Sequence, residues 1–312
     1  MKRILIAYDN SGCADAAIDE LSLAGLPPEL DATVITVAEV WLPPEAGPRD
    51  AEAHDRLPLA VRRAREAAWH AVETDCRARA ERAATRLRAH FPKWNTEALA
   101  VGDSPVRGIL KKAGEWRADL IVVGSHGRSA MERFFLGSVS QKVANEARCS
   151  VRIARPRHLS THPHPRIIVA VDGSPDSEAA VHAVLARRWP AQAQFQLITV
   201  IDSRLKTAAA LPTHWAKEWI QQHDADAGEW VCRAVERLAG PMREAGLALE
   251  THTFEGDPKH LLLQHAEEWK ADCIFLGAHG LEHGEHRPLG SLASAVATRA
   301  HCSVEIVRKQ SS

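Results

Sequence analysis

The sequence lacks any apolar run long enough to span a membrane. No stretch approaches the roughly 20 apolar residues that cross a bilayer, so we expect no membrane partner. The apolar start ends at Asp9, and no cleavage site of the secretory type follows it. These absences favour a cytoplasmic protein over a secreted or membrane-bound one.

An excess of positive charge is also missing. The chain carries 39 Lys and Arg residues against 40 Asp and Glu residues, which gives a formal net charge of −1. Binding to DNA or RNA draws on a basic face that releases counter-ions from the phosphate backbone. We therefore expect no nucleic-acid partner.

Paired cysteines are absent as well. None of the six cysteines forms a C-x-x-C pair, which argues against a zinc ribbon and a thioredoxin-type site. The chain has nine tryptophans but one tyrosine. Trp215, Trp219 and Trp230 fall in one predicted helical region. Core packing is their favoured role, and a hydrophobic ligand pocket or partner surface is the alternative.

The chain contains an internal repeat. The segment from Arg3 to Asp9 recurs as Arg166 to Asp172, and Asp119 to Gly127 recurs as Asp272 to Gly280. An interval of this size indicates a duplicated domain rather than a solenoid. The aperiodic, proline-containing stretch between the copies reads as a linker. We therefore predict a first domain over 1–156, a linker over 157–164 and a second domain over 165–309.

Each copy alternates short β-branched runs with helical stretches. Continuous apolar runs of this kind are typical of parallel strands buried on both faces. The alternation predicts an α/β fold with an open, mostly parallel sheet and helices on both faces. The predicted strands are Ile4–Tyr8, Thr33–Val37, Glu97–Val101, Leu120–Val123, Val151–Ala154, Ile167–Val171, Gln196–Val200, Leu249–Phe254, Cys273–Leu276 and Val304–Val307.

A glycine pattern follows the fourth strand of each copy: Gly, two residues, Gly, nine residues, Gly-Ser. A glycine at a strand end permits a positive φ or a close approach of the backbone to a ligand. The final Gly-Ser opens a helix, whose free N–H groups and positive dipole end suit a phosphate. The alternative is that the glycines only permit tight turns. The matching residues are Gly124, Gly127, Gly137 and Ser138 in the first copy, and Gly277, Gly280, Gly290 and Ser291 in the second.

Asp9 and Asp172 stand at the carboxyl ends of the first strands. Ligands of open α/β sheets bind outside these ends, where the strand order reverses. If the first and fourth strands are neighbours, each aspartate flanks the same crevice as its glycine loop.

With these motifs, and with the continuation Ser138-Val139-Ser140, both copies resemble the ATP-binding branch of the universal stress protein family. The resemblance covers nearly all of each copy and implies a tandem member. It implies two five-stranded sheets of order 3-2-1-4-5 that pair through their last strands, Val151–Ala154 against Val304–Val307. That pairing makes an intramolecular pseudo-dimer, and a dimer of chains stays open as a further assembly.

The resemblance also implies ligand contacts, with ATP as the ligand and Mg²⁺ as its candidate companion. Asp9 and Val37 match positions at the adenosine end. Arg128 follows the second glycine, where its charge suits a phosphate contact. The positions around ribose and phosphates match Gly124, Gly127, Gly137, Ser138 and Ser140. Their counterparts in the second copy are Asp172, Val200, Gly277, Gly280, Gly290 and Ser291.

The second copy departs from this pattern. Leu281 replaces Arg128 and Ala293 replaces Ser140, and two glutamates, Glu282 and Glu285, enter the loop. We therefore expect weaker ATP binding there. The loop histidines His279, His283 and His286 are expected to be solvated, with a zinc site as the alternative.

No nucleophile elbow and no P-loop lysine is present, so at most slow ATP hydrolysis is expected. The favoured function is a non-enzymatic, ATP-binding stress-response regulator that acts on an unidentified protein partner. The alternatives are a slow ATPase, and a protein whose degenerate second copy binds a ligand or partner other than a nucleotide.

Overall fold

A computed structural model of the chain describes residues 1–38, 59–126, 136–156, 164–201, 227–280 and 288–309. In these residues strands and helices alternate, as predicted. The first half contains β1 (Arg3–Ala7), α1 (Gly12–Glu20), the short 3₁₀ helix η1 (Leu21–Leu23), β2 (Asp31–Ala38), α3 (Leu59–His90), β3 (Asn95–Gly102), α4 (Pro105–Trp116), β4 (Leu120–Gly124), α5 (Ser138–Glu146) and β5 (Ser150–Ala154).

The second half repeats this order. It contains β6 (Arg166–Ala170), α6 (Pro175–Leu185), β7 (Gln194–Ile201), α8 (Ala227–Glu244), β8 (Ala248–Glu255), α9 (Pro258–Glu268), β9 (Cys273–Gly277), α10 (Ser291–Arg299) and β10 (Ser303–Val307). All ten predicted strands are confirmed. Tyr8 and Val171 lie one residue beyond β1 and β6, yet their N–H groups still donate to the neighbouring strands, at Ile35 and Ile198.

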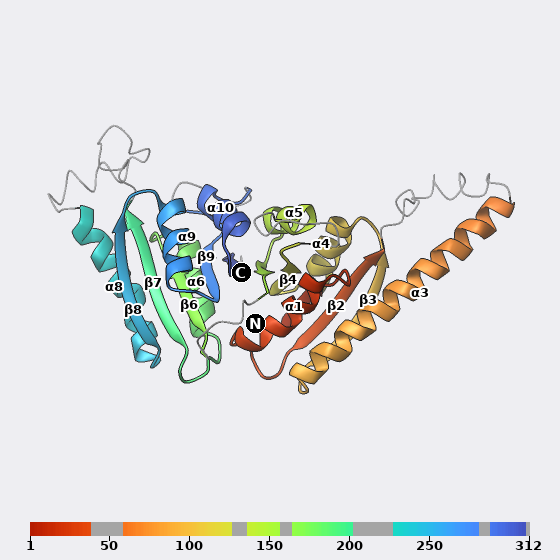
Figure 1. The fold of residues 1–312 in the computed structure, drawn as a ribbon, viewed down its shortest axis with the longest axis horizontal. Helices are drawn as coiled ribbons and strands as arrows, with labels where there is room; N and C mark the ends of the chain where they lie inside the picture. The colour runs from red at the N-terminus through yellow and green to blue at the C-terminus, as the bar shows by residue number, and fades with distance from the viewer. Residues whose placement is uncertain (39–58, 127–135, 157–163, 202–226, 281–287, 310–312) are drawn as a thin grey trace.

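The strands form one continuous ten-stranded sheet of order β3-β2-β1-β4-β5-β10-β9-β6-β7-β8. Each half has the predicted order 3-2-1-4-5 and is parallel throughout. The halves join where β5 pairs antiparallel with β10, which confirms the pairing of the last strands. Figure 1 shows the halves side by side, the N-terminal half on the right.

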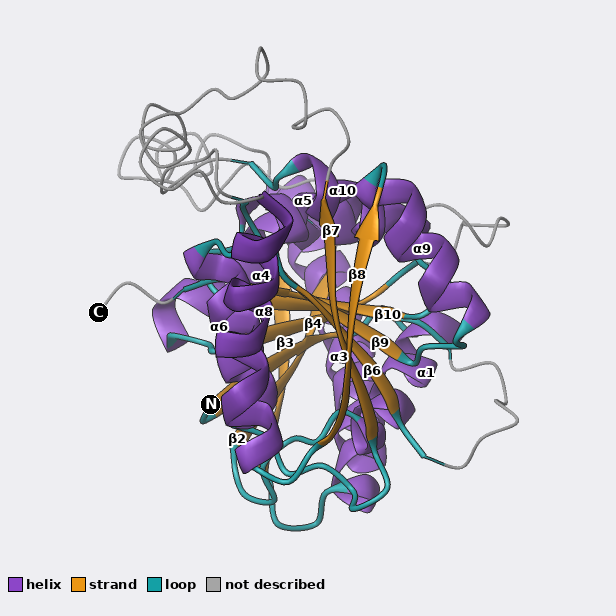
Figure 2. Ribbon diagram, turned by 90° about the vertical axis from the view of Figure 1, so that its left-hand side faces the viewer, coloured by secondary structure: helices purple, strands orange, loops and turns teal. Residues whose placement is uncertain are grey.

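Alternate strand residues point to opposite faces of the sheet and build different cores. Leu5, Ile121 and Val304 belong to one cluster that runs through both halves under α4, α5, α9 and α10. Ile4 and Ile6 face the other way, into a first-half cluster under α1 and α3. A separate cluster lies under α6 and α8. Helices therefore cover both faces (Figure 2), which explains why the strands read as continuous apolar runs.

The longest helix of the described residues is α3, with 32 residues. Its C-terminal half turns small and apolar side chains toward the sheet, namely Cys76, Ala80, Ala83, Ala84 and Leu87. The side chains of its first turns, and those of Trp215, Trp219 and Trp230, lie outside the described part of the chain.

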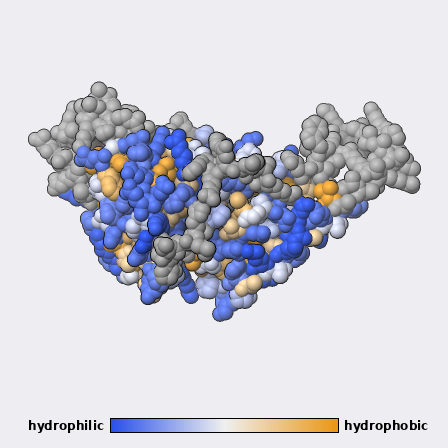
Figure 3. Space-filling model, in the orientation of Figure 1, coloured by the Kyte–Doolittle hydropathy of each residue, from blue (hydrophilic) through white to orange (hydrophobic). Residues whose placement is uncertain are grey.

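The described surface is mainly hydrophilic. Figure 3 shows few apolar residues on one face, and Met1 and Val72 are exposed large hydrophobic residues. Among the described residues, no helix has both the length and the apolar character needed to cross a bilayer.

Candidate functional site

The two strand-end aspartates build the same turn. The Asp9 carboxylate accepts the N–H of Ser11 at 3.0 Å, and the Asp172 carboxylate accepts the N–H of Ser174 at 3.0 Å. The residue between has a left-handed backbone, with φ of 65° at Asn10 and 80° at Gly173. Asparagine tolerates this region better than most residues, so the turn survives the sequence difference.

The serines of these turns begin the next helices. Ser11 is the N-cap of α1, and its hydroxyl accepts the N–H of Ala14 at 3.1 Å. Ser174 caps α6 in the same way, accepting from Ser177 at 3.2 Å. Each helix start therefore lies directly after an aspartate, at the carboxyl edge of the sheet.

Packing excludes a side chain at the glycine that ends β9 but leaves room for a methyl group at the glycine that ends β4. Neither has a positive φ, so the expectation of a positive φ is wrong at both strand ends. A Cβ on Gly124 would lie 3.4 Å from the carbonyl carbon of Cys13. A Cβ on Gly277 would lie only 2.8 Å from the backbone of Asp176 and Ser177. The first turns of α1 and α6 therefore press against these strand ends.

The Gly-Ser pairs lie where the loop returns to the sheet. The N–H of Gly137 donates to the carbonyl of Ser125 at 2.8 Å, and that of Gly290 donates to the carbonyl of Ala278 at 2.9 Å. These glycines are the N-caps of α5 and α10, and neither cap makes a side-chain hydrogen bond. Ser138 and Ser291 are the first helical residues and are exposed. Both helix starts thus offer backbone N–H groups at the loop.

Ser140 has a different position from Ser138. Its side chain is buried, and its hydroxyl donates to the carbonyl of Gly124 at 2.6 Å. It therefore ties α5 to the end of β4. Ala293, its counterpart, is buried but has no hydroxyl to make this bond.

In the second half, the loop and the strand-end carboxylate are in contact. A Cβ on Gly280 would lie 2.8 Å from Oδ2 of Asp172, so only glycine fits against this oxygen. This contact brings together two predicted site residues from β6 and β9, which are neighbours in the sheet. Gly127 and Arg128, the first-half counterparts of Gly280 and Leu281, lie outside the described residues.

Val37 and Val200 lie on the strands beside these aspartates. Ala7 pairs with Ile35 and Ala170 pairs with Ile198, so each valine is level with the aspartate two residues past the strand end. Both valines are half-buried and pack on the shared core. Each half thus has an apolar side chain next to a carboxylate at the point where the strand order reverses.

The halves also differ in a contact between Asp176 and His279, which was not among the predicted site contacts. The Asp176 carboxylate accepts both the N–H of His279, at 3.1 Å, and a bond from its ring Nδ1, at 3.0 Å. The Ser174 hydroxyl also donates to the His279 carbonyl. The sequence does contain a sign of this difference, because the first copy has Cys13 where the second copy has Asp176.

The first-half histidine has other partners. The ring Nδ1 of His126 lies 3.0 Å from the Ser125 hydroxyl, and its Nε2 has no hydrogen-bond partner among the described residues. Burial lowers the pKa of His126, and the nearby Arg155 guanidinium lowers it further. A neutral imidazole therefore adjoins this loop near pH 7.

The zinc alternative falls mostly outside the described part of the chain, because His283, His286 and the two loop glutamates lie there. Within the described ranges, no group of three or more His, Cys, Asp or Glu side chains is arranged to hold a metal ion.

Comparison with known proteins bears on both halves of the chain. The model of the universal stress protein family matches residues 1–155 and again 164–308. A universal stress protein of Methanocaldococcus jannaschii is 33% identical over 146 residues, 46% of this chain and 82% of that protein. One from Mycobacterium tuberculosis is 27% identical over 220 residues, 70% of each chain.

Similarity extends to whole tandem structures. A crystal structure of a universal stress protein from Archaeoglobus fulgidus aligns with a TM-score of 0.65 at 20% identity, covering 99% of this chain and 98% of that one. At this identity the likeness concerns the fold alone. Since the family model matches both halves, the chain belongs to the universal stress protein family and carries two of its domains in tandem.

Proposed function

We propose that this protein is a stress-response regulator that binds ATP between β1 and β4 and, more weakly, between β6 and β9. The observation that carries the proposal is a repeated geometry. In each half a strand-end carboxylate, a strand-end glycine and a helix start without a side-chain cap adjoin one reversal point of the sheet. Open α/β sheets bind nucleotides at such points, and helix N-termini favour phosphate.

The chemistry of these groups fits the parts of ATP. A carboxylate accepts hydrogen bonds from ribose hydroxyls or the adenine amine, and the half-buried valine offers an apolar surface to the base. We assign Asp9 and Val37, with Asp172 and Val200, to the adenosine end. The ribose and phosphates are assigned to Gly124, Gly127, Arg128, Gly137, Ser138, Ser140, Gly277, Gly280, Gly290 and Ser291. Mg²⁺ accompanies the triphosphate as its counter-ion.

Regulation, rather than turnover, is the proposed outcome of binding. The sequence offers no P-loop lysine, which phosphoryl transfer in P-loop enzymes uses to stabilise the transferring group. Bound ATP then stabilises one conformation that a protein partner recognises. A slow ATPase is the competing function, and release of phosphate at the rate of the free nucleotide's own hydrolysis would exclude it.

A non-nucleotide role is favoured for the second half by one observation. Asp176 places a carboxylate against the loop residue His279, next to Gly280. The partly buried Asp176 carboxylate would repel the negatively charged triphosphate of ATP at this place. The second half is therefore the weaker nucleotide site.

The test is titration calorimetry of Mg-ATP into the wild type and into Asp9→Ala, Asp172→Ala and the double variant. We expect Asp9→Ala to weaken the tighter site by about tenfold or more, since hydrogen bonds to charged groups contribute roughly 1.5–3 kcal/mol. Glu236→Ala, which removes an exposed carboxylate from α8, controls for net charge and should leave binding unchanged. Absence of binding to the wild type would refute the proposal.

A further inference from the structure

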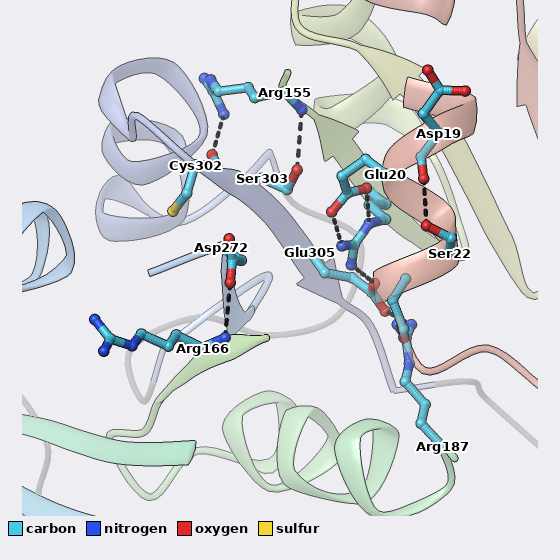
Figure 4. A network of polar contacts seen from close by, with 12 residues as sticks. Asp19, Glu20, Ser22, Arg155, Arg166, Arg187, Asp272, Cys302, Ser303 and Glu305 are labelled. Atoms are coloured by element: carbon cyan, nitrogen blue, oxygen red, sulfur yellow. Dashed lines mark hydrogen bonds and ion pairs between the residues drawn. The ribbon is translucent and has the colours of Figure 1, made fainter. Parts of the chain in front are cut away.

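A cluster of four buried charged side chains in mutual contact lies at the junction between the halves. Arg152 lies on β5, and its guanidinium donates to both Glu20, through Nε at 3.0 Å, and Glu305, through Nη1 at 2.9 Å. Glu305 lies on β10 and pairs on its other side with Arg187. Figure 4 shows Glu20, Glu305 and Arg187 converging here. Exposure of these four side chains ranges from 0% to 7%, so water contributes little to solvating them.

Arg152 and Glu305 occupy the same position in the two copies. Each follows a Cys-Ser-Val segment, Cys149–Val151 in one half and Cys302–Val304 in the other. They also face each other in the antiparallel ladder, where Glu305 pairs with Arg152, Val304 with Ile153 and Ile306 with Val151. The pseudo-twofold axis therefore passes between them. In a pair of identical halves, the residue at this position would face its own copy.

Other contacts at the junction are symmetric and do not distinguish the halves. Arg155 reaches across to the carbonyl of Ala297, at 2.6 Å, near the end of α10. Its counterpart Arg308 reaches back to the carbonyl of Ala144, at 2.6 Å, near the end of α5. Two identical halves would each supply such an arginine and its acceptor. These contacts favour pairing of the halves in general.

The two halves also differ in the size of the residues that follow their first helices. Ala24 and Gly25 of the first half meet Arg187, Arg188 and Trp189 of the second: Arg187 donates to the Ala24 carbonyl at 2.7 Å. A Cβ on Gly25 would lie 2.8 Å from the Trp189 ring. Counted from the helix caps Ser11 and Ser174, Ala24 and Arg187 are equivalent positions. Small residues of one half therefore receive large residues of the other.

We propose that this junction selects unlike halves, with Arg152 and Glu305 as the specificity-determining pair. The net charge of each half does not by itself favour unlike halves, because each half neutralises its own central ion. Arg152 pairs with Glu20 in the first half, and Glu305 pairs with Arg187 in the second. The selection arises at the axis, where the unlike pair is attractive and identical halves would bury like charges face to face. Like-charge juxtaposition at an interface costs several kcal/mol. The surface thus fits only a last strand that carries the opposite charge at this position.

The experiment uses the whole chain with a specific protease site introduced between residues 157 and 163. The cleaved protein is dissociated in urea, returned to buffer and analysed by native mass spectrometry. We expect unlike pairs to exceed identical pairs by at least about tenfold, as a difference of 1.4 kcal/mol requires. A second protein carries Glu20→Leu, Arg152→Leu, Arg187→Leu and Glu305→Leu, which removes every charge of the cluster without leaving one unpaired.

In this second protein the share of identical pairs should rise. Identical pairs in statistical proportion from the parent would overturn the proposal. So would an unchanged preference in the four-leucine protein, since selection would then not come from these charges. Intact chains give a further measurement that does not require reassociation. Glu305→Arg places like charges at the axis and should unfold at lower urea than Glu305→Gln; equal midpoints would contradict the proposal.

Discussion

Tyr8 is the single tyrosine of the chain, and its phenol donates to the Asp15 carboxylate at 2.8 Å. Burial, together with this hydrogen bond, raises its pKa from 10.0 to about 12. The folded state therefore favours the neutral phenol. Its contribution to stability is complete below pH 10 and is lost as pH rises from 10 to about 12.

Alkaline titration followed by tyrosinate absorbance should therefore give a single transition well above that of free tyrosine. In Asp15→Asn the pKa should fall but stay above 10, because burial is the larger of the two causes. A wild-type transition at the value of free tyrosine would show that the Tyr8–Asp15 contact does not persist in solution.

Asp176 and Cys13 occupy equivalent positions in the two copies. Removing the carboxylate from one position and adding a carboxylate at the other tests why the two nucleotide sites differ. Asp176→Asn removes the carboxylate that faces His279 and should strengthen Mg-ATP binding in the second half. Cys13→Asp introduces a carboxylate beside Gly124 and should weaken binding in the first half. We expect changes of about tenfold in opposite directions, the effect of roughly 1.4 kcal/mol. Calorimetric affinities that move in the same direction, or not at all, would contradict this account of the asymmetry.

At the scale of elements, the contact between a helix start and a strand end is tighter in the second half. Gly277→Ala would place a methyl group 2.8 Å from the backbone of α6, whereas Gly124→Ala meets α1 at 3.4 Å, an ordinary contact distance. Backbone cannot move aside as a flexible side chain can. We expect Gly277→Ala to lower the free energy of unfolding by about 1–3 kcal/mol, the usual cost of overpacking.

Gly124→Ala is the matched control and should cost less than about 1 kcal/mol, since no overlap has to be relieved. Urea denaturation followed by tryptophan fluorescence measures both values. Equally small losses in the free energy of unfolding would contradict this prediction, because they would show that both strand ends accommodate a methyl group.

At the scale of the whole molecule, the continuous sheet depends on the buried charges at its centre. Arg152→Leu leaves Glu20 and Glu305 buried without their shared partner. Breaking a buried ion pair from one side costs about 3–5 kcal/mol, because the remaining charge is uncompensated. Arg86→Leu, which breaks the exposed pair with Asp19, should cost no more than about 1 kcal/mol. Urea midpoints that shift equally in the two variants would show that the central charges are hydrated.

Much of the fold was predictable from local patterns. Continuous apolar runs marked the central strands, because parallel strands under two helix layers are buried on both faces. The edge strands β3 and β8 contain more polar residues and are less buried. The recurrence of Asp9 as Asp172 and of Gly124 as Gly277 marked the duplicated domain and the reversal points of the sheet. The strand order and the pairing of β5 with β10 came from family resemblance rather than from the patterns themselves.

The candidate site was predictable in its residue types but not in their contacts. The pattern identified Gly277 as special, yet only packing shows that the first turn of α6 excludes a Cβ there. Ser140 was predicted as a ligand contact, and only the structure shows that its hydroxyl also bonds to the Gly124 carbonyl. Asp176 escaped notice, because nothing in a helix start indicates which loop it will face.

The sequence by itself determined the duplication, the strands and the positions of the glycine-containing loops after the strands, because these features depend on residues close together in the chain. The tertiary structure alone decided which charges meet at the centre. Arg152 and Glu20 lie 132 positions apart, and Arg152 and Glu305 lie 153 apart. The first contact forms within one half, between α1 and β5, and the second arises only where the two halves join edge to edge. The burial that follows makes each charge depend on its partner.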